Sequence, residues 1–212
     1  KQLEKDYKRI VVKIGSSLFC SDERGFEHSI FNHIAGQISK LISLKKDVLI
    51  VSSGAIALGM RVLRLKSRPK ELSYLQAAAS LGQNVLMDNY SQVFGNCGQI
   101  LLTWEDFNDR KRYLNAKNTI LTLLKLGSIP IINENDTVST DEIKFGDNDR
   151  LSALVSSLIG ADLLIILSDV EGLLDKNKKV IRVVDEITPQ IKALASTTNK
   201  KTCVGGMITK IE

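Results

Sequence analysis

Apolar segments of strand length alternate with segments of helical periodicity along this 212-residue chain, and this alternation restricts the fold more than any other feature. Unbroken runs of Ile, Leu and Val are typical of strands that are buried on both faces of a parallel sheet. The expected strands are 10–14, 48–51, 99–103, 129–132 and 163–167. The sequence therefore predicts βα units arranged around a parallel sheet, that is, an α/β fold.

The predicted helices lie between these strands. Apolar side chains recur at helical spacing in 30–44, 55–65, 72–94, 113–126 and 147–159. We expect a break near Gly82 in the third of these segments. Pro189 stands at the first position of a further short helix, 188–195, where its missing N–H has no cost. Residues 180–184 suggest a short hairpin-like piece, and 205–210 suggest a loop that begins another helix.

Composition argues against several classes of protein. Hydrophobic residues make up 43% of the chain and charged residues 25%, which is ordinary for one large globular α/β domain. The net charge is +5, but the basic residues are scattered, and the single Trp104 lies beside two acidic residues. Nucleic-acid binding would need a basic stripe with interleaved aromatic residues, so no nucleic-acid partner is expected.

Cysteine and histidine usage gives no sign of a metal centre. The three cysteines, Cys20, Cys97 and Cys203, are far apart and form no Cys-x-x-Cys pair, which argues against a disulfide framework or a structural zinc site. His28 and His33 are five residues apart and do not share a helix face.

The charged start, 1–8, has no apolar run, and no segment approaches 18 apolar residues. We expect a cytoplasmic protein with no membrane partner.

Polar clusters follow four of the predicted strands: 15–17, 52–54, 133–136 and 168–169. Open parallel sheets bind ligands beyond the carboxyl ends of their strands, and the following helix N-termini offer N–H groups to an anion. The third cluster opens an unusually acidic block, because six carboxylates lie between Asn133 and Asp149 with three asparagines among them. Such a block suits a site that binds an amino group, a carboxylate and a magnesium-nucleotide. Neither a P-loop nor a Gly-x-Gly-x-x-Gly motif is present, so other groups must neutralise the negative charge of a bound phosphate.

Two lysines and one aspartate are the candidates for that role. Lys13 lies within an apolar strand, where a buried ammonium group is costly unless it is paired; the alternative is a solvent-facing lysine on an edge strand. Lys210 follows two glycines and is either a phosphate ligand or an ordinary helix-surface lysine. Together they suggest a pair that neutralises a transferring phosphoryl group. Asp149, an extra carboxylate beyond the helix cap, would hold magnesium or orient the lysines.

Six short motifs occur in the order 11–17, 51–56, 132–136, 145–149, 167–169 and 205–210. In order and spacing they resemble the glutamate 5-kinase family, a branch of the amino acid kinases. The resemblance implies a three-layer α/β/α sandwich around a mainly parallel, eight-stranded sheet. It covers the chain from Arg9 onward. Residues 1–8 would then be a charged N-terminal extension, and 9–212 an amino acid kinase domain that is incomplete at its C-terminus and lacks the PUA domain.

The resemblance also implies an activity and its partners. The reaction would be ATP-dependent phosphorylation of the γ-carboxylate of L-glutamate to γ-glutamyl phosphate, the first step of proline biosynthesis, with Mg²⁺ bound to the nucleotide. Proline feedback inhibition through the 133–145 loop, a homodimer or homotetramer, and handover of the product to glutamyl-phosphate reductase are further expectations. Another carboxylate kinase of the same superfamily is an alternative. A silent regulatory protein on this fold is a second alternative, although its expected mark, loss of Lys13, Lys210 or Asp149, is not seen.

Carried over motif by motif, the resemblance assigns roles to individual residues. The catalytic set would be Lys13 and Lys210, which stabilise the transferring group, and Asp149, which orients both lysines. Ser53, Asp136 and Asn148 would bind glutamate, with Asp136 at the α-amino group. The ATP-binding residues would be Lys13, Gly15, Ser168, Asp169, Val204, Gly205, Gly206, Met207, Ile208, Thr209 and Lys210. No protein-bound metal is expected.

Overall fold

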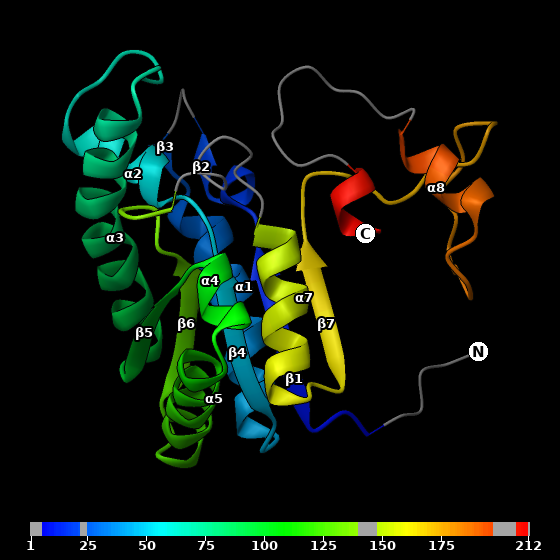
Figure 1. Cartoon of the computed structure of the whole chain (residues 1–212), viewed down its shortest axis with the longest axis horizontal. Helices are drawn as coiled ribbons and strands as arrows, with labels where there is room; N and C mark the ends of the chain where they lie inside the picture. Colours follow the sequence, from blue (N-terminus) through cyan, green and yellow to red (C-terminus); the bar gives the residue numbers. More distant parts are fainter. Residues whose placement is uncertain (1–5, 22–24, 140–147, 197–206, 212) are drawn as a thin grey trace.

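Five parallel strands form the central sheet in the computed structural model, and helices pack on both of its faces (Figure 1). The structure describes residues 6–21, 25–139, 148–196 and 207–211. The strands are β1 (Arg9–Ile14), β4 (Asp47–Ser52), β5 (Cys97–Leu102), β6 (Ile129–Glu134) and β7 (Leu163–Leu167), in the spatial order β5-β6-β4-β1-β7. The predicted α/β fold and its five strands are therefore confirmed. The described residues contain five of the eight strands that the resemblance implied.

The helices connect these strands and cover the sheet. They are α1 (His28–Ser43), α2 (Ala55–Val62), α3 (Leu72–Phe94), α4 (Trp104–Asn108), α5 (Arg110–Lys125), α7 (Asn148–Ile159) and α8 (Pro189–Ser196), with 3-10 segments η1 (Ser16–Leu18) and η2 (Met207–Lys210) and a small antiparallel pair, β2 (Cys20–Ser21) and β3 (Gly25–Phe26). Helix α5 begins at Arg110 rather than at Tyr113, because the Asp109 carboxylate accepts a hydrogen bond from the Arg112 N–H (2.8 Å) and caps the helix there. Helix α4 was not predicted.

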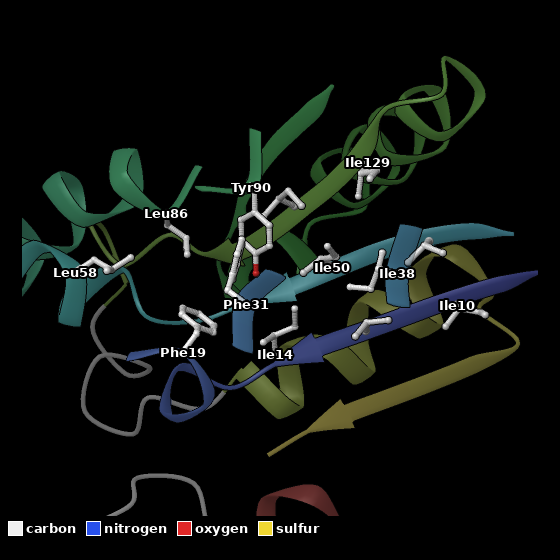
Figure 2. Close-up of a cluster of buried hydrophobic side chains, with 13 residues drawn as sticks. Ile10, Ile14, Phe19, Phe31, Ile38, Ile50, Leu58, Leu86, Tyr90 and Ile129 are labelled. Carbon is white, nitrogen blue, oxygen red and sulfur yellow. The ribbon is translucent and has the colours of Figure 1, made fainter. Parts of the chain in front are cut away.

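Two hydrophobic cores lie on opposite faces of the sheet, because side chains alternate along each strand. On β1, Ile10 and Ile14 belong to the first core, together with Phe31 of α1 and Tyr90 of α3 (Figure 2). Val11 belongs to the second core, where α5 and α7 pack. Lys13 has the same parity as Val11 and therefore lies on the α7 face of the sheet. This register aims the only charged side chain within the apolar part of β1 at the start of α7.

Glycines allow α2 and α3 to pack against each other at very short range. A Cβ atom at Gly82 would lie 1.8 Å from the Ala55 carbonyl oxygen, and one at Gly59 would lie 1.7 Å from the Ala78 carbonyl oxygen. The predicted break near Gly82 is wrong, since α3 runs without interruption from Leu72 to Phe94. The glycine is a contact point between two helices, and this close approach, rather than a helix end, is the reason that no side chain fits there.

The segment after β7 is mostly irregular before α8, and it lies beside the β7 edge of the sheet (Figure 1). The hairpin-like piece expected at 180–184 is confirmed at its start, around Val180, although residues 181–184 form no strand. A single antiparallel bridge joins Leu174 to Val180, while the Asp175 carboxylate accepts hydrogen bonds from the N–H groups of Asn177 and Lys179 and closes the turn. The short helix predicted at 188–195 is confirmed as α8. Among the described residues, no helix combines the length and apolar character needed to cross a membrane.

We expect Gly82→Ala to destabilise the protein by about 3 kcal/mol, because the added methyl group must push α2 and α3 apart. Gly36→Ala is the matched control: Gly36 lies on the exposed side of α1, and nothing lies within 4 Å of an added Cβ. The control should be neutral or stabilising by about 0.5–1 kcal/mol. Urea unfolding followed by circular dichroism measures both values. Equal stability of the two variants would contradict the packing described here.

Candidate active site

The predicted site residues converge at the carboxyl ends of β1, β4 and β6. Ser53 and Asp136 lie just beyond β4 and β6, and Asn148 and Asp149 form the first turn of α7. Segments that are far apart in the sequence, from Lys13 to Lys210, meet at this edge because all the strands point in the same direction.

An ion cluster forms the centre of the site. The Lys13 ammonium lies 2.6 Å from one oxygen of Asp149, and the Lys210 ammonium lies 2.7 Å from the other. Lys13 and Asp149 are 7% and 3% exposed, so both charges are largely withdrawn from water. Lys13 is thus a buried, paired lysine of a central strand rather than a solvent-facing one of an edge strand. Lys210 is likewise ion-paired rather than free on a helix surface.

The two lysines determine the charge of Asp149. Burial acts to raise the pKa of the Asp149 carboxyl, but the charges and hydrogen bonds of Lys13 and Lys210 outweigh it and hold the pKa below its usual value of 3.8. The position in the first turn of α7 also favours a negative charge. Asp149 is therefore ionised at neutral pH and holds both ammonium groups in fixed places.

A chain of amide groups lies next to the ion cluster. The Asn148 side-chain amide nitrogen is within hydrogen-bond distance of the Ser52 carbonyl oxygen (2.5 Å), the Ser53 hydroxyl (3.0 Å) and the Asn133 side-chain oxygen (2.8 Å). Asn133 in turn donates to the side-chain oxygen of Gln83 in α3 (2.9 Å). The network fixes Asn148 and Ser53 relative to each other. Gln83 was missed by the sequence analysis, because nothing in a helical pattern indicates which polar residue faces a distant strand end.

An open cavity of about 100 Å³ lies beside this network. All three predicted glutamate-binding residues line it, namely Ser53, Asp136 and Asn148. It is also lined by Ser16, Gly54, Ala55, Ile56, Ala57, Arg68, Asn133 and Glu134. Arg68 and Glu134 were not among the predicted site residues. Arg68 belongs to the connection between α2 and α3, which has no strand-end position to single it out.

The two carboxylates of the cavity differ from ordinary acidic residues. Burial raises the pKa of Asp136 to about 6, and the charge of Arg68 acts in the opposite direction. Burial is also the main cause that raises the pKa of Glu134 to about 7. Each carboxyl group is therefore protonated in a fraction of the molecules near neutral pH, unlike Asp149, and a bound cation would favour its ionised form, with release of the proton to solvent.

The described residues predicted to bind ATP lie at the ends of β1 and β7 and in the segment 207–210. The Gly15 N–H donates to the Leu167 carbonyl at 3.2 Å, and a Cβ atom at Gly15 would lie 3.8 Å from the Lys13 ammonium nitrogen. Ser168 and Asp169 follow β7 directly, half-buried and exposed respectively. Val204, Gly205 and Gly206 lie outside the described residues. Met207–Lys210, which includes Ile208 and Thr209, forms η2, and this segment contacts α7 and α8.

The donor set fits a nucleotide phosphate better than a protein-bound metal. Two ammonium groups, those of Lys13 and Lys210, complement phosphate oxygens. Within residues 6–21, 25–139, 148–196 and 207–211, no three His, Cys, Asp or Glu side chains gather in a way that could hold a metal ion.

Comparison with known proteins places the chain in a family. The sequence model of the amino acid kinase family matches residues 8–212. The chain belongs to the amino acid kinase family. It is 51% identical over 214 residues to a glutamate 5-kinase of Cupriavidus metallidurans, in a match that covers 96% of this chain. It is 49% identical over 217 residues to a glutamate 5-kinase of Nitrosospira multiformis, in a match that covers 98% of this chain. In both cases it spans 58% of the relative's length.

Solved structures agree on the amino acid kinase fold. A carbamate kinase from Giardia lamblia bound to AMP-PNP has a TM-score of 0.62 with this chain at 19% sequence identity, and the match covers 97% of this chain and 86% of that one. A second structure, the same kinase bound to citric acid, has a TM-score of 0.61. At this level of identity the likeness concerns the fold alone.

Asp149→Asn should lower the free energy of unfolding at pH 7 by about 3 kcal/mol, because it leaves two ammonium groups without their shared carboxylate. The loss should shrink as the pH falls from 3.8 towards the lower pKa of the folded carboxyl, because the unfolded chain, and then the folded protein, takes up the proton. Urea unfolding at pH 7 and at pH 3 measures both. Asp47→Asn, which removes the half-exposed partner of Arg9, is the control and should cost less than about 1 kcal/mol. A pH-independent loss at Asp149 would contradict the ion cluster as its cause.

Proposed function

We propose that this chain contains the kinase site of an enzyme that transfers the γ-phosphoryl group of ATP to the γ-carboxylate of L-glutamate. The product is γ-glutamyl phosphate, the first intermediate of proline biosynthesis. The observation that carries the proposal is Asp149 held at 2.6 and 2.7 Å from two lysines, beside a cavity lined by charges of both signs. Relatives that are about half identical and named glutamate 5-kinase support glutamate as the acceptor.

The chemistry follows from the placement of positive charge. ATP supplies the phosphoryl group and Mg²⁺ accompanies its phosphates, while Gly15, Ser168, Asp169 and residues 204–210 form its binding site. Lys13 and Lys210 neutralise the negative charge that two approaching anions bring together, which is the main barrier to an in-line transfer. Asp149 keeps both ammonium groups in place, so that little reorganisation is needed when the carboxylate oxygen attacks. No covalent enzyme intermediate is required.

The cavity provides the acceptor side of the reaction. Ser53 and Asn148 bind the substrate carboxylate that is to be phosphorylated, because they border both the cavity and the ion cluster. Asp136 binds the α-ammonium group. The acyl phosphate product is prone to hydrolysis, so a site that excludes water protects it.

Two alternatives were open from the sequence. An inactive regulatory protein is disfavoured, since a buried cluster of three charges costs desolvation energy that a merely structural role does not repay. Another carboxylate kinase would keep the ion cluster and differ in the cavity.

The proposal extends to the protein's partners and organisation. It includes proline feedback inhibition, a homodimer or homotetramer, handover to glutamyl-phosphate reductase and a cytoplasmic location. It also includes the division into an N-terminal extension, 1–8, and a kinase domain from residue 9 onward.

ADP release from Mg-ATP with L-glutamate tests the proposal, with hydroxylamine present to trap the acyl phosphate and proline added in parallel. Glutamate-dependent ADP release with hydroxamate formation is the expected result. Turnover with aspartate or N-acetylglutamate instead of glutamate would keep the kinase chemistry and change the acceptor. ADP release that no carboxylate acceptor stimulates would overturn the proposal.

Lys13→Ala and Asp149→Ala should each reduce kcat by about two orders of magnitude or more, the usual effect of losing one charge that stabilises the transition state. The trapped-hydroxamate assay gives the rates. Lys111→Ala, which removes an exposed lysine of α5, serves as the control and should leave kcat within about twofold. Near-normal turnover in either site variant would remove that residue from the catalytic set.

Asp136→Asn should act on substrate binding rather than on chemistry. The amide keeps the shape of the side chain but loses the charge that attracts an ammonium group, so KM for L-glutamate should rise at least about tenfold while KM for ATP stays constant. Asp88→Asn, on the exposed side of α3, is the control. An unchanged KM for glutamate would place the amino-group contact elsewhere.

A further inference from the structure

Glu134, the last residue of β6, is an unusual group to find in the wall of a cavity. The residue is only 3% exposed, and among the described residues no group makes a hydrogen bond of normal geometry with either carboxylate oxygen, although the Ser139 hydroxyl lies nearby. Buried carboxylates in folded proteins are normally paired or hydrogen-bonded, because taking an unpaired charge out of water is costly. An unpaired buried carboxylate that lines a cavity therefore points to a ligand that supplies the missing partner.

The groups around Glu134 tell which partner is missing. Asp136 follows it on the same wall of the cavity, and Glu105 and Asp106 of α4 add negative charge from a neighbouring element, while the nearby Ser139 hydroxyl favours the ionised form. Among the described residues that line the cavity, Arg68 alone is a cation, and its charge acts on Asp136. The cavity thus has one more carboxylate than its own cation can balance.

We propose that Glu134 and Asp136 together form the receptor for the α-ammonium group of the amino acid substrate. This inference rests on the proposed function and extends it to a residue with no assigned role. An ammonium group carries three donors and one positive charge, so two carboxylates can accept from it and share its charge. A carboxylate ligand has no donor to offer these two groups, so the pair complements an amino acid rather than a simple dicarboxylic acid.

A divalent cation is the chief rival as the missing partner. Calcium and magnesium sites use six or more oxygen ligands, several of them from carboxylates. In the described part of the chain, no group of three acidic or other metal-binding side chains includes this pair. An ammonium group, by contrast, needs only the acceptors that are present.

The pair should couple substrate binding to the release of a proton. In the free protein, burial raises the pKa of Glu134 to about 7, so that roughly half of the molecules carry its proton at neutral pH. The bound ammonium group favours the ionised carboxylate. Binding therefore expels the proton, and affinity for L-glutamate should increase as the pH rises from 6 to 8.

Glu134→Gln tests the proposal by calorimetric titration of L-glutamate in two buffers of different ionisation enthalpy. The wild-type protein should release protons on binding at pH 7, and its affinity should rise about tenfold between pH 6 and pH 8. The variant should bind about tenfold more weakly at pH 8 and lose most of the proton release. Glu105→Gln is the matched control, because it removes a nearby negative charge that does not line the cavity, and it should stay within about twofold of wild type.

Glutarate, which is L-glutamate without its amino group, distinguishes two roles of Glu134: binding the ammonium group of the ligand, or only maintaining the structure of the cavity. Glu134→Gln should leave glutarate binding unchanged or improve it, measured by displacement of L-glutamate. Equal weakening of both ligands would overturn the inference. Glu134→Asp keeps the charge and should retain the proton release, which provides a second variant if the amide does not fold.

The outcomes also separate this inference from the proposed function. A wild-type protein that releases protons on binding L-glutamate but forms no acyl phosphate contradicts the proposed function and still supports the ammonium receptor. A wild-type protein that phosphorylates glutamate, with an unchanged affinity and pH dependence in Glu134→Gln, overturns the ammonium receptor alone.

Discussion

The shared carboxylate of Asp149 is the interaction on which the arrangement of the site depends. It joins the central strand β1, the first turn of α7 and the segment 207–210, and it adds a shared charge to the apolar packing between β1 and α7. The pairing is possible only because β1 lies inside the sheet and its register aims Lys13 at α7. A buried pair of ammonium groups would otherwise repel, so the position of each lysine depends on the same carboxylate.

Adjacent residues divide the site into two halves of opposite character. Asp149 faces two cations, where phosphate charge is expected, whereas Asn148 faces the amide network and the cavity with its two carboxylates. Under the proposed function, this one helix turn sets the distance between the phosphoryl donor and the acceptor. Such rigid placement is what a reaction between two anions needs most, because the gain comes from orientation and fixed charge rather than from a nucleophile of the protein.

The sequence was sufficient for the features that local pattern determines. Apolar runs located the five strands of the described sheet, and the polar pattern singled out Lys13, Asp149 and Lys210, which the structure brings together. The sequence pattern failed to predict the positions of residues that are determined by contacts between distant segments. Gly82 was taken for a helix break because its contact with α2 is invisible in sequence. Gln83 and Arg68 were missed because only the packing of α3, and of the connection before it, brings them to the strand ends. Glu134 was visible within an acidic block, but its burial without a partner was not.

The site also divides into groups that stabilise the fold and groups that weaken it. Asp149 has a lowered pKa, so its contribution to stability is present above pH 3.8 and is lost as the pH falls through its folded value. Glu134 has the opposite sign: its pKa rises from 4.5 to about 7 on folding, so the folded state loses stability as the pH increases across that range. At neutral pH the free protein therefore holds a carboxyl group whose ionised form would be more stable in water. A cationic ligand reverses this penalty, so part of the binding free energy comes from relieving a cost that was built into the empty cavity.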